Sequence, residues 1–355
     1  MVLAVLLAAG ATVASLAGGG ASDGAETAAA TSTTVRERRS TTAPRRRVTS
    51  TASTIPAALA LESLPPGVTA GVLLVGTPSG RVFRADLATG AVTRVDAPSG
   101  AIREAWNVRF VGGNLVASLP RGVVALSPDD LAVRTDLGAS NTFYIGGSRL
   151  WLVEFDQGPP VAREVRFDSS GTQIGRPHSL PAAADVRAAT EAGLVIQVGG
   201  QAFLYDPEIG TGEPLPGGSI VAASGDRIAR VACDRSLVCG LVVSDLSGRE
   251  LASVAPPEGA VIDPWASGSF SPDGSRLWVS VSRAEHPPSP VIVDVATGET
   301  TVVDAGRSWQ GNGSWLGDWA LVPTEDGLLA IGPEGVVSFG EAVFGVVQWV
   351  VTIES

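Results

Sequence analysis

The sequence has 355 residues, of which 45% are apolar and 17% charged, with 43 Gly and 24 Pro. Such a chain can bury a large core, but its frequent Gly and Pro divide it into short elements, which favours an all-β domain. The formal charge is −11, and this acidic balance argues against nucleic acid as a partner, because nucleic acid requires clustered positive charge.

The scarcity of Cys and His narrows the chemistry further. The chain has two Cys and two His, which argues against zinc sites, Cys–His nucleophiles and Ser–His–Asp triads. It also lacks a Gly-rich phosphate loop and a nucleophile elbow. We therefore expect no metal ion and no cofactor, and we assign no catalytic residue.

The N-terminal segment, residues 1–19, contains an uncharged and largely apolar run from Val2 to Ala17. Its length lies between the core of a signal peptide and a membrane-spanning helix, and Ser15-Leu16-Ala17 supplies a small–x–small cleavage pattern. No positive charge precedes the run, and six Arg follow it at 36–47, at the edge of the reach of the positive-inside rule. We expect export, with this segment as a signal peptide or membrane anchor and the only part in contact with a membrane.

Residues 20–66 are rich in Ala, Thr, Ser, Arg and Pro and have almost no large apolar side chains. They cannot bury enough surface to offset the entropy lost on ordering, so we expect a disordered linker. A flexible chain of that length has an end-to-end distance of roughly 40 Å. The linker is thus predicted to tether the globular part, residues 67–355.

The globular part repeats one unit. Its clearest copy, residues 263–303, contains four predicted strands separated by the turn SPDG at 271–274, a Pro-rich loop and the turn ATGE at 296–299. Alternating β-branched and small residues between such turns are typical of strands and hairpins. Related hairpins recur at intervals of roughly 40 residues, and a four-stranded unit of that period is typical of a β-propeller blade.

Two motifs relate this repeat to known propellers. FSPDG at 270–274, followed by Leu277, resembles the F-S-P-D-G-x-x-L motif of WD40-like propellers of the TolB type. DLATG at 86–90 and DVATG at 294–298 resemble the D-x-x-T-G turn that these repeats share with YVTN-type and quinoprotein repeats. The resemblance covers about 285 residues with one strong copy, and it implies an architecture that hosts many functions.

The units number seven. The first, residues 72–96, has three predicted strands and lacks the innermost one, whereas residues 344–353 form a spare strand after the seventh unit. We expect this C-terminal strand to complete the first blade, because closure removes open sheet edges. The predicted fold is an all-β, seven-bladed β-propeller, preceded by an apolar leader helix and a disordered stalk, and we expect a monomer.

Cys233 and Cys239 lie close together between two β-rich runs, across the predicted hairpin of the second and third strands of blade five. Facing positions on adjacent strands come close enough for a disulfide. Two separate buried thiols are the alternative. A disulfide would support an oxidising compartment and would be structural.

Five of the eight Trp, at 106, 265, 309, 315 and 349, fall on or next to the predicted innermost strands of neighbouring blades. Aromatic faces beside amides and carboxylates suit a polar ligand such as a glycan. Packing between blades is the alternative role for these Trp. The candidate ligand-binding residues at the mouth of the channel are Trp106, Asn107, Asp263, Trp265, Gln310, Asn312, Trp315, Gln348 and Trp349.

These features lead to a functional hypothesis: an extracytoplasmic, membrane-anchored or secreted propeller that binds a protein or glycan partner in the cell envelope. One alternative is a propeller enzyme, either a glycan hydrolase or lyase or a quinone-cofactor dehydrogenase. The dehydrogenase is disfavoured because no Trp follows the D-x-x-T-G turns, where quinoprotein repeats use one for docking between blades. Another alternative is a scaffold without a ligand.

Overall fold

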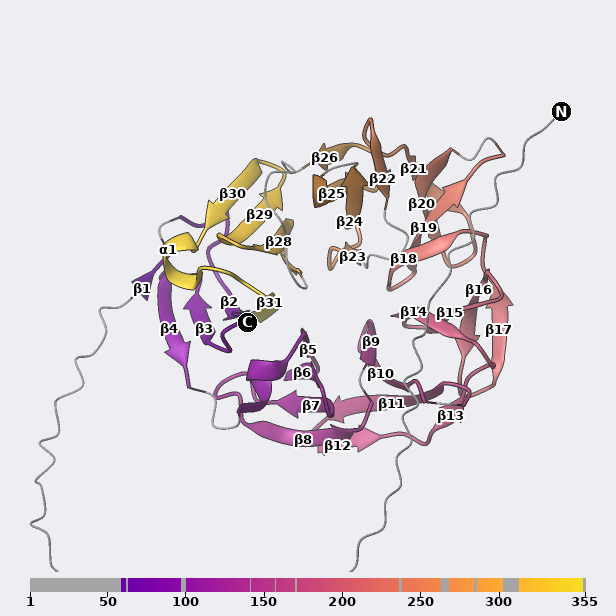
Figure 1. Ribbon diagram of the computed structural model, residues 1–355, viewed down its shortest axis with the longest axis horizontal. Coiled ribbons are helices and arrows are strands. Elements are labelled where there is room, and N and C mark those ends of the chain that lie inside the picture. Colours follow the sequence, from indigo (N-terminus) through magenta and orange to yellow (C-terminus); the bar gives the residue numbers. More distant parts are fainter. Residues whose placement is uncertain are drawn as a thin grey trace, which may run out of the picture. The chain divides into compact units, whose positions relative to one another are not determined.

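The computed structural model describes residues 59–61, 63–96, 100–140, 142–156, 158–169, 171–235, 238–262, 268–283, 286–302 and 313–353. These residues form seven antiparallel sheets arranged as the blades of a closed ring (Figure 1). The predicted seven-bladed, all-β propeller is therefore confirmed. Within the described part of the chain no helix is long and apolar enough to cross a membrane, and the predicted leader, residues 1–19, lies outside it.

In blades 2 to 4 the strands follow sequence order from the axis of the ring outward, whereas blade 1 takes its innermost strand from the C-terminal part of the sequence. From the innermost strand outward, blade 1 contains β31 (Trp349–Ile353), β2 (Val72–Gly76), β3 (Val82–Asp86), β4 (Ala91–Val95) and β1 (Leu59–Ala60). Blade 2 contains β5 (Asn107–Val111), β6 (Asn114–Leu119), β7 (Gly122–Leu126) and β8 (Val133–Gly138). Blade 3 contains β9 (Thr142–Gly146), β10 (Arg149–Glu154), β11 (Val161–Asp168) and β12 (Gly171–Ile174), with β13 (His178–Ser179) also on β11. Blade 4 contains β14 (Asp185–Thr190), β15 (Gly193–Val198), β16 (Gln201–Asp206) and β17 (Thr211–Pro214).

The remaining blades complete the ring. Blade 5 contains β18 (Ser219–Ser224), β19 (Arg227–Cys233), β20 (Cys239–Asp245) and β21 (Glu250–Val254). Blade 6 contains β24 (Arg276–Arg283), β25 (His286–Asp294) and β26 (Thr300–Val302), with β22 (Ala260–Ile262) and β23 (Ser269–Phe270) both on the inner side of β24. Blade 7 contains β27 (Ser314–Leu316), β28 (Trp319–Thr324), β29 (Gly327–Gly332) and β30 (Gly335–Phe339). Two short helices, η1 (Gly100–Glu104) and α1 (Glu341–Phe344), precede β5 and β31.

The core lies between the blades. Among the described residues, seven hydrophobic clusters each join two neighbouring blades, so that every interface around the ring has one. A strand in the middle of a blade is covered on both faces, as the fully buried β28 and β29 illustrate. Their near-continuous apolar sequence follows from this double burial.

The predicted closure by the C-terminal strand is confirmed. β31 pairs antiparallel with β2 along its full length, from Gly76 opposite Trp349 to Val72 opposite Ile353. The strand is shorter than the predicted 344–353, because α1 ends at Phe344 and brings the Phe344 ring against Phe83, with their centroids 5.6 Å apart.

The propeller begins before the predicted boundary at residue 67. β1 adds a short strand to the outer edge of blade 1 through pairing with β4. Leu61 is buried and Leu64 packs against the cluster between blades 7 and 1. These two Leu therefore belong to the globular domain, although they lie within a segment of linker-like composition.

Candidate functional site

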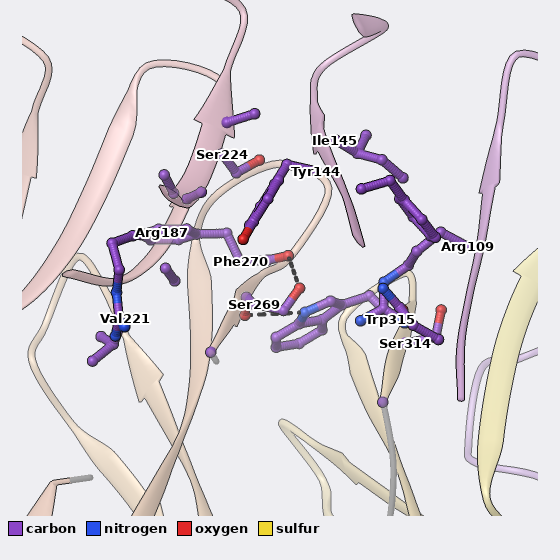
Figure 2. A pocket seen from close by; sticks show the side chains of 18 of the residues that line it. Arg109, Tyr144, Ile145, Arg187, Val221, Ser224, Ser269, Phe270, Ser314 and Trp315 are labelled. Carbon is purple, nitrogen blue, oxygen red and sulfur yellow. Dashed lines mark hydrogen bonds between the residues drawn. The ribbon is translucent and has the colours of Figure 1, made fainter. Parts of the chain in front are cut away.

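The inner strands of the seven blades surround a central cavity of about 720 Å³. Each blade contributes to its wall, from β5 in blade 2 around to Thr352 of β31 in blade 1. Figure 2 shows that side chains of both polar and aromatic character line it. A cavity of this size can hold a small organic molecule or the end of a larger one.

Polar residues recur two positions apart on three neighbouring inner strands. The pairs are Asn107 and Arg109 on β5, Thr142 and Tyr144 on β9, and Asp185 and Arg187 on β14, and all six residues line the cavity. Residues two apart in a regular strand share a face; in β14, whose register shifts between Val186 and Ala188, the ion pair of Asp185 and Arg187 shows that these two side chains also lie together. The repeated spacing therefore gives blades 2 to 4 a polar wall.

Arg109 is the cation that β5 contributes to this wall. Its side chain is half-buried, its Nη1 donates a hydrogen bond to the carbonyl oxygen of Val108 at 3.1 Å, and no Asp or Glu of the described residues lies within 4.0 Å of its guanidinium nitrogens. Burial lowers the pKa of Arg109 to about 10. The group is therefore still charged at neutral pH.

Arg187 is held in place by protein groups. Its guanidinium donates hydrogen bonds to the Asp185 carboxylate at 3.3 Å and to the carbonyl oxygen of Ile220 at 3.2 Å. Between the two arginines lies Tyr144 (Figure 2), whose hydroxyl donates to the carbonyl oxygen of Val186 at 2.7 Å. Burial, with a smaller contribution from the Asp185 carboxylate, raises the pKa of Tyr144 to about 12. Tyr144 therefore stays protonated and acts as a hydrogen-bonding group.

Blades 6, 7 and 1 form the other side of the cavity. Trp315 is 5% exposed, and its Nε1 donates a hydrogen bond to the carbonyl oxygen of Ser269 at 3.2 Å. The hydroxyls of Ser314 and Thr352 lie 3.1 Å apart, and Thr352 also donates to the carbonyl oxygen of Trp315 at 2.7 Å. In Figure 2 the Arg109 side chain extends from β5 toward Ser314 and Trp315, while Arg187 lies on the opposite side.

The structure brings only some of the sequence-predicted residues together. Asn107 and Trp315 line the cavity. Trp106, at the start of blade 2, is 41% exposed, whereas Trp349 is 1% exposed in the cluster between blades 1 and 2. Gln348, half-buried beside Trp349, donates its backbone N–H to Gly76. Asp263, Trp265, Gln310 and Asn312, as well as Trp309, lie outside the described residues.

Sequence reasoning missed the charged residues of the cavity, Arg109, Asp185 and Arg187, and also Tyr144. The signal that could have found Arg109 is the two-residue period of the strand, because Arg109 shares a face with Asn107, one of the candidates. Within the described residues, no three side chains of His, Cys, Asp or Glu lie close enough to hold a metal ion.

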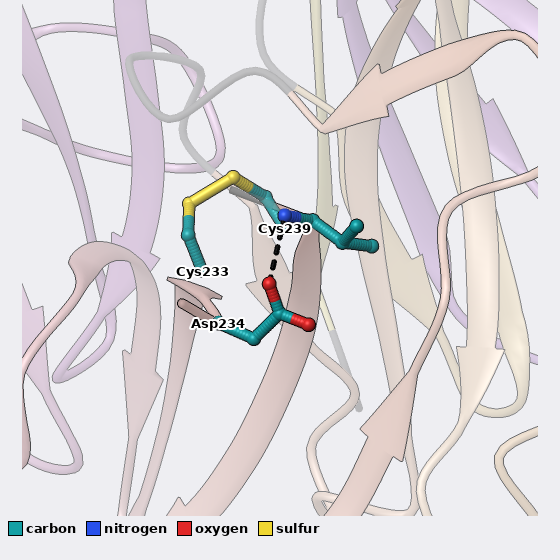
Figure 3. The surroundings of a disulfide bond; sticks show 4 residues. Cys233, Asp234 and Cys239 are labelled. Atoms are coloured by element: carbon teal, nitrogen blue, oxygen red, sulfur yellow. Dashed lines mark hydrogen bonds between the residues drawn. A yellow bond between two sulfur atoms is a disulfide. The ribbon is translucent and has the colours of Figure 1, made fainter. Parts of the chain in front are cut away.

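The predicted disulfide is present. Cys233 ends β19 and Cys239 begins β20, so that the two residues face each other in the register of blade 5 and are joined by a bond (Figure 3). Asp234 accepts a hydrogen bond from the backbone N–H of Val238 at 3.0 Å, which closes the turn inside the bridge.

No protein-family model and no curated protein sequence matches this chain. Similar solved structures include TolB from Acinetobacter baumannii, with 13% identity over 81% of this chain and 67% of that one and a TM-score of 0.46. An apocarotenoid oxygenase mutant from Synechocystis has 12% identity over 83% and 94% and a TM-score of 0.51. A protein from Lactobacillus plantarum has 12% identity over 80% and 99% and a TM-score of 0.48. At such identities the likeness concerns the fold alone, and the chain is a seven-bladed β-propeller.

Proposed function

We propose that this protein is an extracytoplasmic binding module, whose central cavity and the face around it recognise a protein or glycan partner in the cell envelope. The cavity of about 720 Å³ carries this proposal, because all seven blades contribute to one polar-walled space. The Cys233–Cys239 bridge supports the location, since disulfides persist in oxidising compartments.

Exposed apolar side chains on one face support a macromolecular partner. In a four-stranded antiparallel blade, the start of the inner strand and the turn between the second and third strands lie on the same face. Trp106 and Val346 precede inner strands, and Phe155 and Val238 lie between second and third strands. All four are at least 40% exposed, so a macromolecule that covered this face would bury apolar side chains from four blades, which would favour its binding.

A photo-crosslinking residue introduced at Phe155 tests this function in the envelope of the native cell. The matched control is the same residue at Ile209, which is 72% exposed and lies between β16 and β17, on the opposite face. We expect a discrete crosslinked partner from position 155 and none from 209. Equal crosslinking from both faces, or none from either, would contradict the proposal.

The alternative, a propeller enzyme with a bound cofactor, has a separate readout. Protein purified from its native host would then carry a chromophore in its absorbance spectrum or a metal in elemental analysis. A stoichiometric amount of either the chromophore or the metal would support the enzyme and contradict the binding module.

A further inference from the structure

We propose that the central cavity binds a carboxylate group, with the Arg109 guanidinium as its principal partner. This inference rests on the proposed function, because it names the chemistry of the ligand at the same cavity. Its evidence is the charge and the hydrogen bonding of the cavity wall.

The first step concerns Arg109 itself. A guanidinium has five N–H donors in a planar fork and no acceptor, and the structure assigns one of them, on Nη1, to the carbonyl oxygen of Val108. A half-buried charge without an opposite charge costs stability, which makes it a candidate for function. For the other donors no acceptor is found among the described residues, and Arg109 lines the cavity, where a ligand can approach it.

The second step is the charge balance. Among the described residues that line the cavity, the charged side chains are Arg109, Asp185 and Arg187. Arg187 is balanced by Asp185 at 3.3 Å, so one positive charge is left. A carboxylate carries one negative charge and matches the fork of a guanidinium with two parallel hydrogen bonds. A phosphate, with up to two negative charges, would be only partly neutralised there.

The third step is size. The cavity, at about 720 Å³, is far larger than a carboxylate group, so the carboxylate would belong to a larger polar molecule. Hydroxyls of Ser224, Ser269 and Ser314 and the Tyr144 ring also line the cavity (Figure 2). Such groups suit the hydroxyls and the ring of a sugar acid. The geometry therefore points to a carboxylate-bearing ligand of about the size of a sugar acid or larger.

The test compares glucuronate with glucose, which differ in the carboxylate, at constant ionic strength. Binding is measured by calorimetry and by thermal stabilisation, with succinate as a carboxylate without a sugar and inorganic phosphate as a different anion. We expect saturable binding of glucuronate and none of glucose. Succinate binding as tight as that of glucuronate would also support the carboxylate, while showing that the sugar ring is not recognised.

Variants link the binding to Arg109. Arg109→Gln should weaken glucuronate binding by at least about tenfold, since it removes a charge-assisted pair, and its thermal midpoint should not fall, because it removes an uncompensated charge. Arg109→Lys keeps the charge without the fork and should bind with intermediate affinity. The control Arg94→Gln changes an exposed arginine of β4 and should bind like the wild type.

Three results would overturn the inference: tighter binding of phosphate than of either carboxylate, no binding of any carboxylate to the folded wild type, or unchanged binding in Arg109→Gln. Its failure is distinguishable from that of the proposed function. A partner that crosslinks at position 155, in a protein whose cavity binds no carboxylate, would leave the module in place and reject the carboxylate. Carboxylate binding without any crosslinked partner would support the carboxylate site and reject the binding module.

Discussion

Asp273 holds the turn of the strongest repeat motif together. Its Oδ1 accepts hydrogen bonds from the Ser271 hydroxyl at 2.7 Å, the Ser275 backbone N–H at 3.0 Å and the Ser275 hydroxyl at 2.9 Å. The bond from the Ser271 hydroxyl, followed by those from Ser275, lowers the pKa of Asp273 to about 2. The SPDG motif thus has a local structural cause, since its polar residues close the turn between β23 and β24.

This lowered pKa predicts a pH dependence of stability. Because the folded-state pKa lies below the ordinary value of 3.8, the contribution of the carboxylate is fully present above about pH 4 and is lost as the pH falls toward 2. Asp273→Asn should therefore lower the free energy of unfolding at pH 6, and the difference from the wild type should shrink at pH 2.5. Urea unfolding at both pH values measures this.

The control for this experiment is Asp96→Asn, which changes a carboxylate whose side chain is 92% exposed. It should leave the free energy of unfolding nearly unchanged at pH 6. An Asp273→Asn variant whose difference from the wild type is the same at both pH values would show that the charge of Asp273 does not stabilise the turn.

Trp349 shows what the sequence does not reveal about single residues. The sequence places it among the candidates for the channel mouth, but in the structure it is a core residue that lies against Gly76, where an added Cβ would come within 2.0 Å of its ring. The faces of an inner strand point toward the two neighbouring blades, so a side chain reaches the cavity only where a neighbour leaves room. Gly76, which is distant in the sequence, leaves room for the Trp349 ring, and Trp349 therefore packs in the cluster between blades 1 and 2 and not at the cavity.

At the scale of elements, the hairpin of β19 and β20 is stabilised by its disulfide. In the chain-entropy model, a bridge across a loop of this length stabilises the folded state by about 2 kcal/mol. The double variant Cys233→Ser, Cys239→Ser should lose about that much free energy of unfolding and should no longer respond to dithiothreitol. Guanidinium unfolding of both proteins, with and without the reductant, measures the effect.

The wild type provides the matching control, because reduction should lower its stability to that of the double variant. If the reductant left the wild type unchanged, the bridge would contribute nothing to stability. If the reductant also lowered the free energy of unfolding of the double variant, its effect would not come from this disulfide.

The residues of the turns predicted most strands, whereas the start of β25 and the whole of β1 were not predicted. The two Asp-x-x-Thr-Gly turns occur where expected because the Asp side chain bonds the backbone two or three residues on, as Asp294 does with Ala296 and Thr297. β25 begins at His286, within the predicted Pro-rich loop, because β24 continues to Arg283 and pairs with it. The two-residue β1 was missed, since its pairing with β4 depends on a neighbour about thirty positions away.

At the scale of the whole molecule, the period of the repeat carried the prediction of the fold. One blade cannot bury both of its faces, and each of the seven hydrophobic clusters therefore needs two blades. The blade count and the closure follow from that requirement together with the missing inner strand of the first unit. The identity of the cavity ligand cannot be predicted in this way, because the repeat determines the packing of the blades and not the side chains at the axis.

The ring predicts unequal consequences for the loss of its two end strands. Removal of residues 347–355 takes away Val347, Trp349, Val350 and Val351, all at most 2% exposed, and each buried apolar side chain contributes about 2 kcal/mol. This loss, together with an open edge on β2, is comparable to the whole stability of a domain, about 5–15 kcal/mol. The truncated protein should lack a cooperative thermal transition in circular dichroism.

A chain that starts at Leu61 is the matched control, because it lacks β1 at the outer edge of the same blade. β1 pairs with β4 at two positions, and its Ala60 is exposed, so this chain should keep its thermal midpoint within a few degrees, as expected for a loss below about 1 kcal/mol. A cooperative transition in the C-terminal truncation would mean that six complete blades and an incomplete blade 1 hold the ring without its closing strand. The difference between the two truncations therefore tests whether stability comes from closure around the axis rather than from the number of strands.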